Sequence, residues 1–340
     1  LGYLVAGAAI GEYGFNIVTA SQTHLLAEFG VVFLLFAIGL ELSFERLKAM
    51  RKYVLGLGSS QVALSAIVIS GAVVLFTNDS SAAIIIGGGL ALSSTAIVLQ
   101  VIEESRNQSS QVGRIALAIL LMQDFIVVPL LVIVPLLSKS NDSLIIQAVG
   151  SAFLKAMVAL VGIFVTGRIV LRPLFKLIST EKSETSNELF IAVTLLIVLS
   201  AAWGTEYLGL SLALGAFVAG ILVAETEFRN KAEESIHPFK GLFLGLFFMS
   251  VGMTIDVLEI YNQLDKILIF SAALLIVKAL IIIALCFLFG LSKSVSVHTG
   301  FMLAQGGEFA FILFNLGMKN NVLDPDMGKM LLLVVTFTMA

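Results

Sequence analysis

Charged residues and cysteines are both scarce in this chain. Charged side chains make up 13% of its 340 residues and hydrophobic side chains 59%, whereas a typical soluble domain is about 25% charged. With a mean hydropathy of +1.05, this composition excludes a soluble globular protein and predicts a polytopic membrane protein. A net charge of -3 points to no nucleic-acid partner. The single cysteine, Cys286, excludes an intrachain disulfide and a cysteine-based metal cluster.

Long apolar segments recur along the whole chain. Windows of about 20 residues place them at 1–11, 25–42, 54–77, 82–102, 115–137, 152–171, 189–203, 208–224, 239–254, 267–290, 297–316 and 330–340. We expect all of them to be helices, because a helix satisfies its own backbone hydrogen bonds in lipid. The first and last segments begin or stop inside apolar sequence, so we expect the chain, 1–340, to be a transmembrane fragment truncated at both ends.

Basic residues alternate between successive loops. Most of the 20 lie at 46–52, 106–114, 168–182, 229–240 and Lys293, and the intervening loops hold only Lys139, Lys266, Lys319 and Lys329. Cytoplasmic loops of membrane proteins are enriched in Lys and Arg. The first set of loops is therefore predicted to face the cytoplasm.

One carboxylate, Asp124, lies near the middle of the apolar segment 115–137. A charge at bilayer depth costs roughly 2.5–3.5 kcal/mol on insertion scales, so an intramembrane acid predicts a functional site. A carboxylate holds either a proton or a dehydrated cation, and this exclusion couples the two flows when the site faces alternate sides of the membrane. Gln123 adds a neutral amide beside it, and Lys278 is a basic residue near the centre of 267–290.

Two of the apolar segments contain glycine and polar residues at mid-membrane. The polar members are Ser93, Ser94 and Thr95 in the first and Gln305 and Glu308 in the second. Glycine weakens a helix, and hydroxyl side chains satisfy freed backbone groups, so each run predicts a helix break. Close packing of continuous helices through small residues is the alternative. Paired interrupted segments in two halves are typical of inverted-repeat transporters with a site at the midplane.

The other polar residues leave several alternatives open. Glu41 is either an interfacial acid or a buried support for the core, and Glu308 either pairs structurally or takes part in an ion path. No second aspartate lies at mid-membrane, which argues against an intramembrane aspartyl protease. A channel-like efflux pathway and an antiporter are not separated by these residues. His24, His237 and His298 share no metal-ligand spacing.

Five short motifs carry a resemblance to a known family. They are FAIGLEL at 36–42, ALSSTA at 91–96, QD at 123–124, GLFFMSVGM at 245–253 and QGGEFAF at 305–311. These motifs resemble those of the cation:proton antiporters of the Kef type, the glutathione-gated potassium efflux systems of bacteria. The resemblance implies an all-α polytopic fold of thirteen helices with two inverted repeats, two crossing broken helices, a core domain and a dimerisation domain. It places the first repeat at about 1–137 and the second at about 152–340, and one helix before Leu1.

The resemblance also implies a function and assigns site residues. It implies a secondary antiporter, not an enzyme, that exchanges potassium, or alternatively sodium, for a proton as a homodimer in a bacterial inner membrane. Asp124 matches the ion-binding carboxylate and Gln123 its partner. Lys278 matches the basic residue beside the carboxylate. The resemblance also assigns Ser93, Ser94 and Thr95 at the first break to ion binding, with potassium or sodium held at Asp124. Supporting positions are Lys278, Glu41, and Gln305 and Glu308 at the second break. A cytoplasmic nucleotide-binding regulatory domain is implied to follow, and these 340 residues contain no glycine-rich nucleotide motif of their own.

Overall fold

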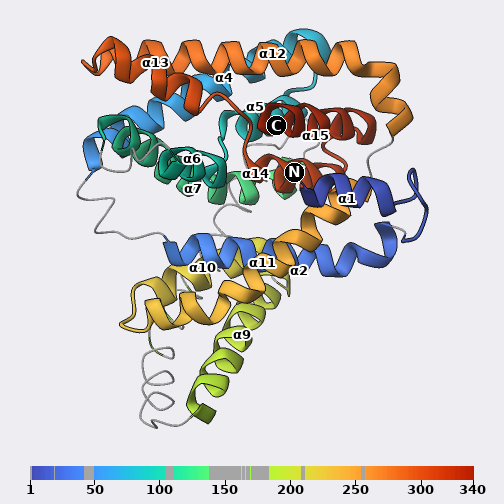
Figure 1. Cartoon of the computed structure of the whole chain (residues 1–340), viewed down its shortest axis with the longest axis vertical. Helices are drawn as coiled ribbons and strands as arrows, with labels where there is room; N and C mark the ends of the chain where they lie inside the picture. The colour runs from blue at the N-terminus through green and yellow to red at the C-terminus, as the bar shows by residue number, and fades with distance from the viewer. Residues whose placement is uncertain are drawn as a thin grey trace. The chain divides into compact units, whose positions relative to one another are not determined.

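The secondary structure is helical throughout the described part of the chain. The computed structural model describes residues 2–18, 20–41, 50–104, 110–137, 162, 165, 169, 184–207, 211–253 and 257–340. Every regular element in these ranges is a helix (Figure 1). This confirms the all-α prediction. The segment predicted at 152–171 lies almost entirely outside the described residues.

The chain forms two compact units, each assembled from two segments that are far apart in the sequence. Unit 1 contains Glu45–Leu130 and Ile255–Ala340, and unit 2 contains Gly2–Phe44 and Leu131–Thr254. Because each unit combines segments from both halves of the chain, the predicted inverted repeats do not coincide with the units. The repeat boundaries stay a prediction.

Unit 1 contains the helices with unusual sequences. Its elements are the π-helix η1 (Lys52–Gly58), α4 (Ser59–Thr77), α5 (Ser80–Ala91), α6 (Thr95–Glu104), most of α7 (Gln111–Leu137), α12 (Val257–Leu288), α13 (Lys293–Met302), α14 (Glu308–Lys319) and α15 (Pro325–Met339). Helix α12 packs against α4, α13 and α15, and α5 packs against α4 and α14. A buried apolar cluster that includes Leu57, Val98, Ile119 and Ile282 joins η1, α6, α7 and α12.

Unit 2 is held together by close helix packing. It consists of α1 (Gly2–Ile10), α2 (Ala20–Glu41), α9 (Glu184–Tyr207), α10 (Leu212–Ala224), α11 (Arg229–Met253) and the end of α7. Gly39 of α2 and Gly220 of α10 face one another, and a Cβ at either would collide with the backbone of the other helix. In lipid, where apolar side chains gain little from association, such backbone approach is a main source of packing energy.

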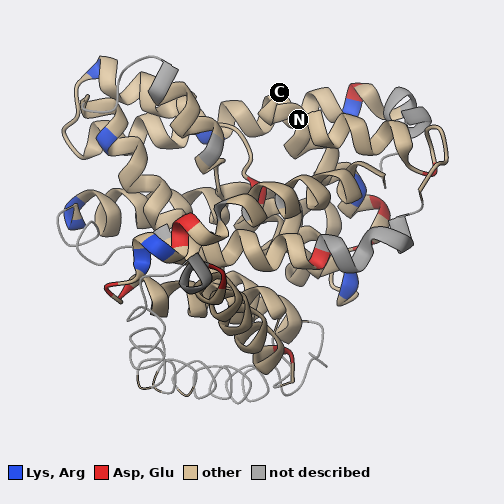
Figure 2. Ribbon diagram, turned by 60° about the horizontal axis from the view of Figure 1, so that its bottom comes forward, with Lys and Arg blue, Asp and Glu red and all other residues tan. Residues whose placement is uncertain are grey.

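Several helices are suited to crossing a membrane. Within the described residues, four are long and apolar enough: Lys52–Thr77, Gln111–Leu137, Glu188–Tyr207 and Gln263–Leu288. Helix α11 adds a fifth if its two parts, bent by 44° at a break that contains Pro238, form one span; proline removes a backbone hydrogen bond and bends a helix. In Figure 2 most of the ribbon belongs to uncharged residues.

The predicted spans in the described part correspond to helices, with two kinds of difference. The segments 82–102 and 297–316 are each two helices rather than one, which is the outcome that their glycine and polar residues predict. Helix α11 begins at Arg229 instead of near residue 239, and α13 begins at Lys293 instead of near residue 297. Hydropathy misses such starts because the first turns of these helices are polar.

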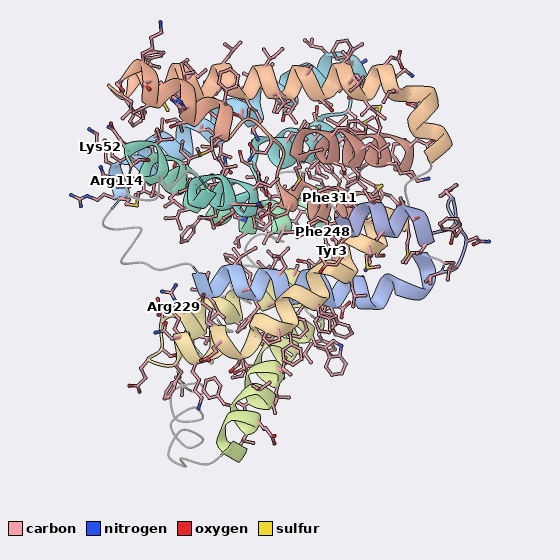
Figure 3. All side chains as sticks on the ribbon, in the orientation of Figure 1. Tyr3, Lys52, Arg114, Arg229, Phe248 and Phe311 are labelled. Carbon is pink, nitrogen blue, oxygen red and sulfur yellow. The ribbon has the colours of Figure 1, made fainter. Side chains whose placement is uncertain are left out.

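Two basic residues from the predicted cytoplasmic loops lie toward the same side of unit 1. Figure 3 labels Lys52 at the start of η1 and Arg114 in the first turns of α7, both toward the left of the view. Both residues are exposed. The assignment of that side to the cytoplasm stays a prediction from loop charge.

Candidate functional site

The first helix break lies between α5 and α6 at residues 92–94. Helix α5 begins at an Asp79 cap, whose carboxylate accepts from the amides of Ser81 and Ala82 at 2.9 and 3.0 Å. It ends where Leu92 takes an extended conformation, with φ -79° and ψ 152°. Ser94 is fully buried, and its hydroxyl accepts from the amide of Ile97 at 3.4 Å, which caps α6.

The second break lies between α13 and α14 at residues 303–307. Gly307 precedes α14 in an extended conformation, with φ -114° and ψ 162°. The amide of Gly306 donates to the Thr338 hydroxyl of α15 at 3.0 Å. Both interruptions therefore lie where the sequence predicts them, and side chains satisfy part of the backbone that each one frees.

The two breaks contact one another. The Ser93 hydroxyl donates to the carbonyl oxygen of Leu303 at 2.7 Å. A Cβ at Gly307 would lie 2.8 Å from the carbonyl carbon of Ser93, closer than real contacts allow. Gly307 is therefore required for this approach, and the two broken helices cross at their interrupted points.

Lys278 of α12 ties the two breaks together. Its ammonium group donates to the carbonyl oxygens of Leu92 and Gln305, each at 2.7 Å, and to the Ser93 hydroxyl at 3.2 Å. The residue is fully buried, and an ammonium has three protons to donate. All three are thus used on the breaks. The resemblance places Lys278 beside the carboxylate, whereas its hydrogen bonds in the structure go to backbone and hydroxyl groups.

Asp124 and Gln123 approach the first break from α7. Asp124, the fourteenth of the 27 residues of α7, is 7% exposed. The Thr95 hydroxyl donates to its carboxylate at 3.4 Å. The Gln123 side-chain oxygen accepts from the amide of Ser93 at 2.8 Å, and its side-chain nitrogen donates to the Ser93 hydroxyl at 3.3 Å.

The supporting residues of the second break have different surroundings. Glu308 is buried and is the first residue of α14, where an acid is favoured by the helix dipole. Gln305 contributes its backbone oxygen to Lys278, and its buried side-chain nitrogen has no hydrogen-bond partner among the described residues. Glu41 ends α2, in unit 2, and its side chain lies outside the described residues.

One further buried residue of the site was missed in the sequence. Gln61 of α4 is fully buried, and its side-chain oxygen accepts from the Gln123 side-chain nitrogen at 2.8 Å. Its own nitrogen donates to the carbonyl oxygen of Ala91 at 3.1 Å and to the Ser65 hydroxyl at 3.2 Å. The signal was available, because an amide within the apolar segment 54–77 is unusual for a membrane span.

Asp124 is the one acid that these contacts place beside the first break. Within the described part of the chain, no three His, Cys, Asp or Glu side chains come together as a metal site. The Asp124 carboxylate and the Thr95 hydroxyl lie together, whereas the carbonyl oxygens of Leu92, Leu303 and Gln305 already accept from Lys278 or Ser93.

Comparison with known proteins identifies the family. The family described as "Sodium/hydrogen exchanger, transmembrane" matches residues 1–340. The chain belongs to this family. The exchanger chain is 46% identical over 349 residues to "K(+) efflux antiporter 2, chloroplastic" of Arabidopsis thaliana, and 44% identical over 349 residues to "K(+) efflux antiporter 1, chloroplastic" of the same plant. Each match covers 100% of this chain and 29% of the relative, so the chain spans less than a third of these proteins.

A solved structure confirms the fold. The exchanger chain is similar to the sodium proton antiporter MjNhaP1 of Methanocaldococcus jannaschii at pH 8, with a TM-score of 0.69 and 16% identity. The match covers 99% of this chain and 86% of that one. The chain therefore has the antiporter fold, and it is a multi-pass integral membrane protein of a family of exchangers rather than enzymes.

Proposed function

We propose that this chain exchanges a monovalent cation, potassium, for a proton, and that Asp124 is the group that carries either ion. The observation behind the proposal is a buried carboxylate at the middle of α7, beside the hydroxyl of Thr95 and next to two helix breaks that touch. A carboxylate in this position binds a cation when ionised and releases it when protonated. Exchange follows if the site opens to the two sides of the membrane in turn.

The choice of potassium is supported by two features. The relatives at 44% and 46% identity are named K(+) efflux antiporters. The residue beside Asp124 is the neutral amide Gln123 rather than a second acid. Potassium is larger and more weakly hydrated than sodium, so it tolerates a neutral oxygen where sodium favours a second charge.

Two further assignments belong to the proposal. The exchanger is a homodimer, as the Kef-type resemblance implies. Its membrane is either the bacterial inner membrane that the same resemblance implies or an organelle membrane, since both named relatives are chloroplastic. Chemical cross-linking in native membranes tests the dimer, and fractionation of the source cells tests the membrane.

The deciding experiment is ion exchange in proteoliposomes. Purified protein is reconstituted around a pH-sensitive dye, and potassium, sodium, rubidium and lithium chloride are added to separate samples. We expect potassium and rubidium to move protons, and Asp124→Asn to reduce exchange to the level of protein-free vesicles. The control is Asp265→Asn, which changes an exposed acid on α12 and should leave exchange intact. Robust exchange by Asp124→Asn would refute the role of this carboxylate, and potassium flux without proton movement would indicate a channel.

A further inference from the structure

The side chains of Gln61 and Gln123 form a continuous bridge across the first break. The bridge runs from the amide of Ser93 to Gln123, from Gln123 to Gln61, and from Gln61 to the carbonyl oxygen of Ala91. Both ends are backbone groups of the same interrupted helix. In a continuous helix, the carbonyl of residue 91 and the amide of residue 93 would each have a helical partner. The two glutamines, here called the glutamine bridge, connect these two groups through side chains instead.

The direction of every hydrogen bond in the bridge is determined. A backbone carbonyl only accepts, so the nitrogen of Gln61 must face Ala91 and its oxygen must face Gln123. The nitrogen of Gln123 must then face Gln61, and its oxygen must face the amide of Ser93, which only donates. Turning either amide over would bring two oxygens or two N–H groups together at both of its ends.

Close helix approach explains why Gln61 reaches both partners. A Cβ at Gly58, three residues before Gln61, would lie 2.6 Å from the Cβ of Met122, the neighbour of Gln123. A Cβ at Gly87 would lie 2.6 Å from the carbonyl oxygen of Ala66. Glycine at these positions lets α7 pack directly against the end of η1 and α5 against the middle of α4. The π-helix η1 ends at Gly58 and immediately precedes this contact; π-helical turns are frequent at functional sites.

We propose that Gln61 is a positioning residue that fixes the Gln123 amide and selects a neutral side chain at position 123. A carboxylate at that position has no proton to donate, so one of its oxygens would face the oxygen of Gln61. Gln61 cannot turn over to relieve this, because its oxygen would then face the carbonyl of Ala91. The bridge thereby keeps Asp124 as the single acid of the Gln123–Asp124 pair. The effect of Gln61 on transport rests on the proposed function, whereas its effect on which side chain fits at position 123 does not.

The test is a double-mutant cycle between Gln61→Met and Gln123→Glu in the complete protein. Methionine matches glutamine in length and has neither amide group, and Gln123→Glu is the isosteric acid. We expect Gln61→Met alone to lower the melting temperature in detergent, because it removes the hydrogen bonds of Gln61 to Gln123, Ala91 and Ser65. The cation KM should rise by about fivefold with a smaller change in kcat, as expected for the loss of the one buried hydrogen bond that holds the Gln123 amide. In the Gln123→Glu background, Gln61→Met should lower the melting temperature less or raise it, because it removes the facing oxygen.

The matched control is Ser70→Ala. Ser70 lies on the same helix, and its hydroxyl donates to the carbonyl oxygen of Ala83 on α5 at 2.8 Å, outside the bridge. Its effect on melting temperature should be equal in both backgrounds. If Gln61→Met folds poorly, Gln61→Asn, which keeps an amide one methylene shorter, should show the same coupling with a smaller amplitude. Additive shifts for Gln61 and Gln123, or an unchanged cation KM in Gln61→Met, would overturn the proposal. Absence of exchange by the wild-type protein would instead overturn the proposed function, since the melting cycle does not depend on transport.

Discussion

At the scale of single residues, the buried Lys278 is the charged side chain that hydrogen-bonds both helix breaks. Its position therefore depends on Leu92, which is 186 residues away in the sequence, and on Gln305, which is 27 residues away. A buried ammonium is stable only when its protons are accepted. Its three acceptors lie where the interrupted helices free backbone carbonyls. The charge therefore organises the site through these acceptors.

Replacing Lys278 should reveal this tethering role. Lys278→Met leaves the carbonyl oxygens of Leu92 and Gln305 without their donor, and a buried unsatisfied group costs about 1–3 kcal/mol. We expect a loss of roughly 2–6 kcal/mol in stability, measured as a lower melting temperature in detergent. Lys278→Gln retains two N–H donors and should therefore lose less stability than Lys278→Met. Equal melting temperatures for the two variants would show that hydrogen-bond donation is not what the lysine supplies.

At the scale of secondary structure, the breaks depend on small residues as much as on polar ones. Gly307 lies against the Ser93 backbone, and Gly89 against the ring of Phe314. The glycine and polar runs at 86–96 and 305–309 predicted interruptions, and both interruptions are present. In the first run the glycines 87–89 stay within α5, and the helix ends only after Ala91. The sequence could not show that the two interruptions would contact one another, because a glycine permits close helix approach but does not determine which helix approaches it.

The Gly307→Ala variant tests the contact between the breaks. The new methyl group would lie 2.8 Å from the carbonyl carbon of Ser93, so backbone must move apart. Overpacking of this kind costs typically about 1–3 kcal/mol, and we expect lower thermal stability together with reduced exchange in proteoliposomes. Gly204→Ala is the control, because nothing lies within 4 Å of a Cβ at Gly204. Comparable stability and exchange for both variants would contradict the close contact.

At the scale of the whole molecule, the site belongs to one compact unit. Gln61, Ser93, Gln123, Asp124, Lys278 and Gln305 all lie in unit 1. This unit takes its helices from the middle and the end of the chain, and unit 2 takes its helices from the beginning and the middle. The two sequence segments that form the site are therefore separated along the chain by Leu131–Thr254, which belongs to unit 2.

The charge balance of the site predicts electroneutral exchange. One carboxylate trades one proton for one monovalent cation, and Lys278 keeps its three acceptors and its proton in our proposed cycle. We expect a pH gradient to drive cation movement in proteoliposomes without a response from a potential-sensitive dye under symmetric salt. A sustained dye response that Asp124→Asn abolishes would mean that a second proton or charge moves in each turnover.

Local properties of the sequence determined the membrane class, the helical fold and the position of the buried acid. Hydropathy over about 20 residues predicts a membrane span, and runs of glycine and hydroxyl residues predict an interruption in it. A lone acid such as Asp124 can be recognised in the sequence because the residues around it are apolar. The tertiary structure decided the partners. The hydrogen bonds between Gln61 and Gln123, Lys278 and Leu92, and Ser93 and Leu303 join residues 62, 186 and 210 positions apart. Each bond depends on helices that approach only after folding, so no pattern within one segment reports it.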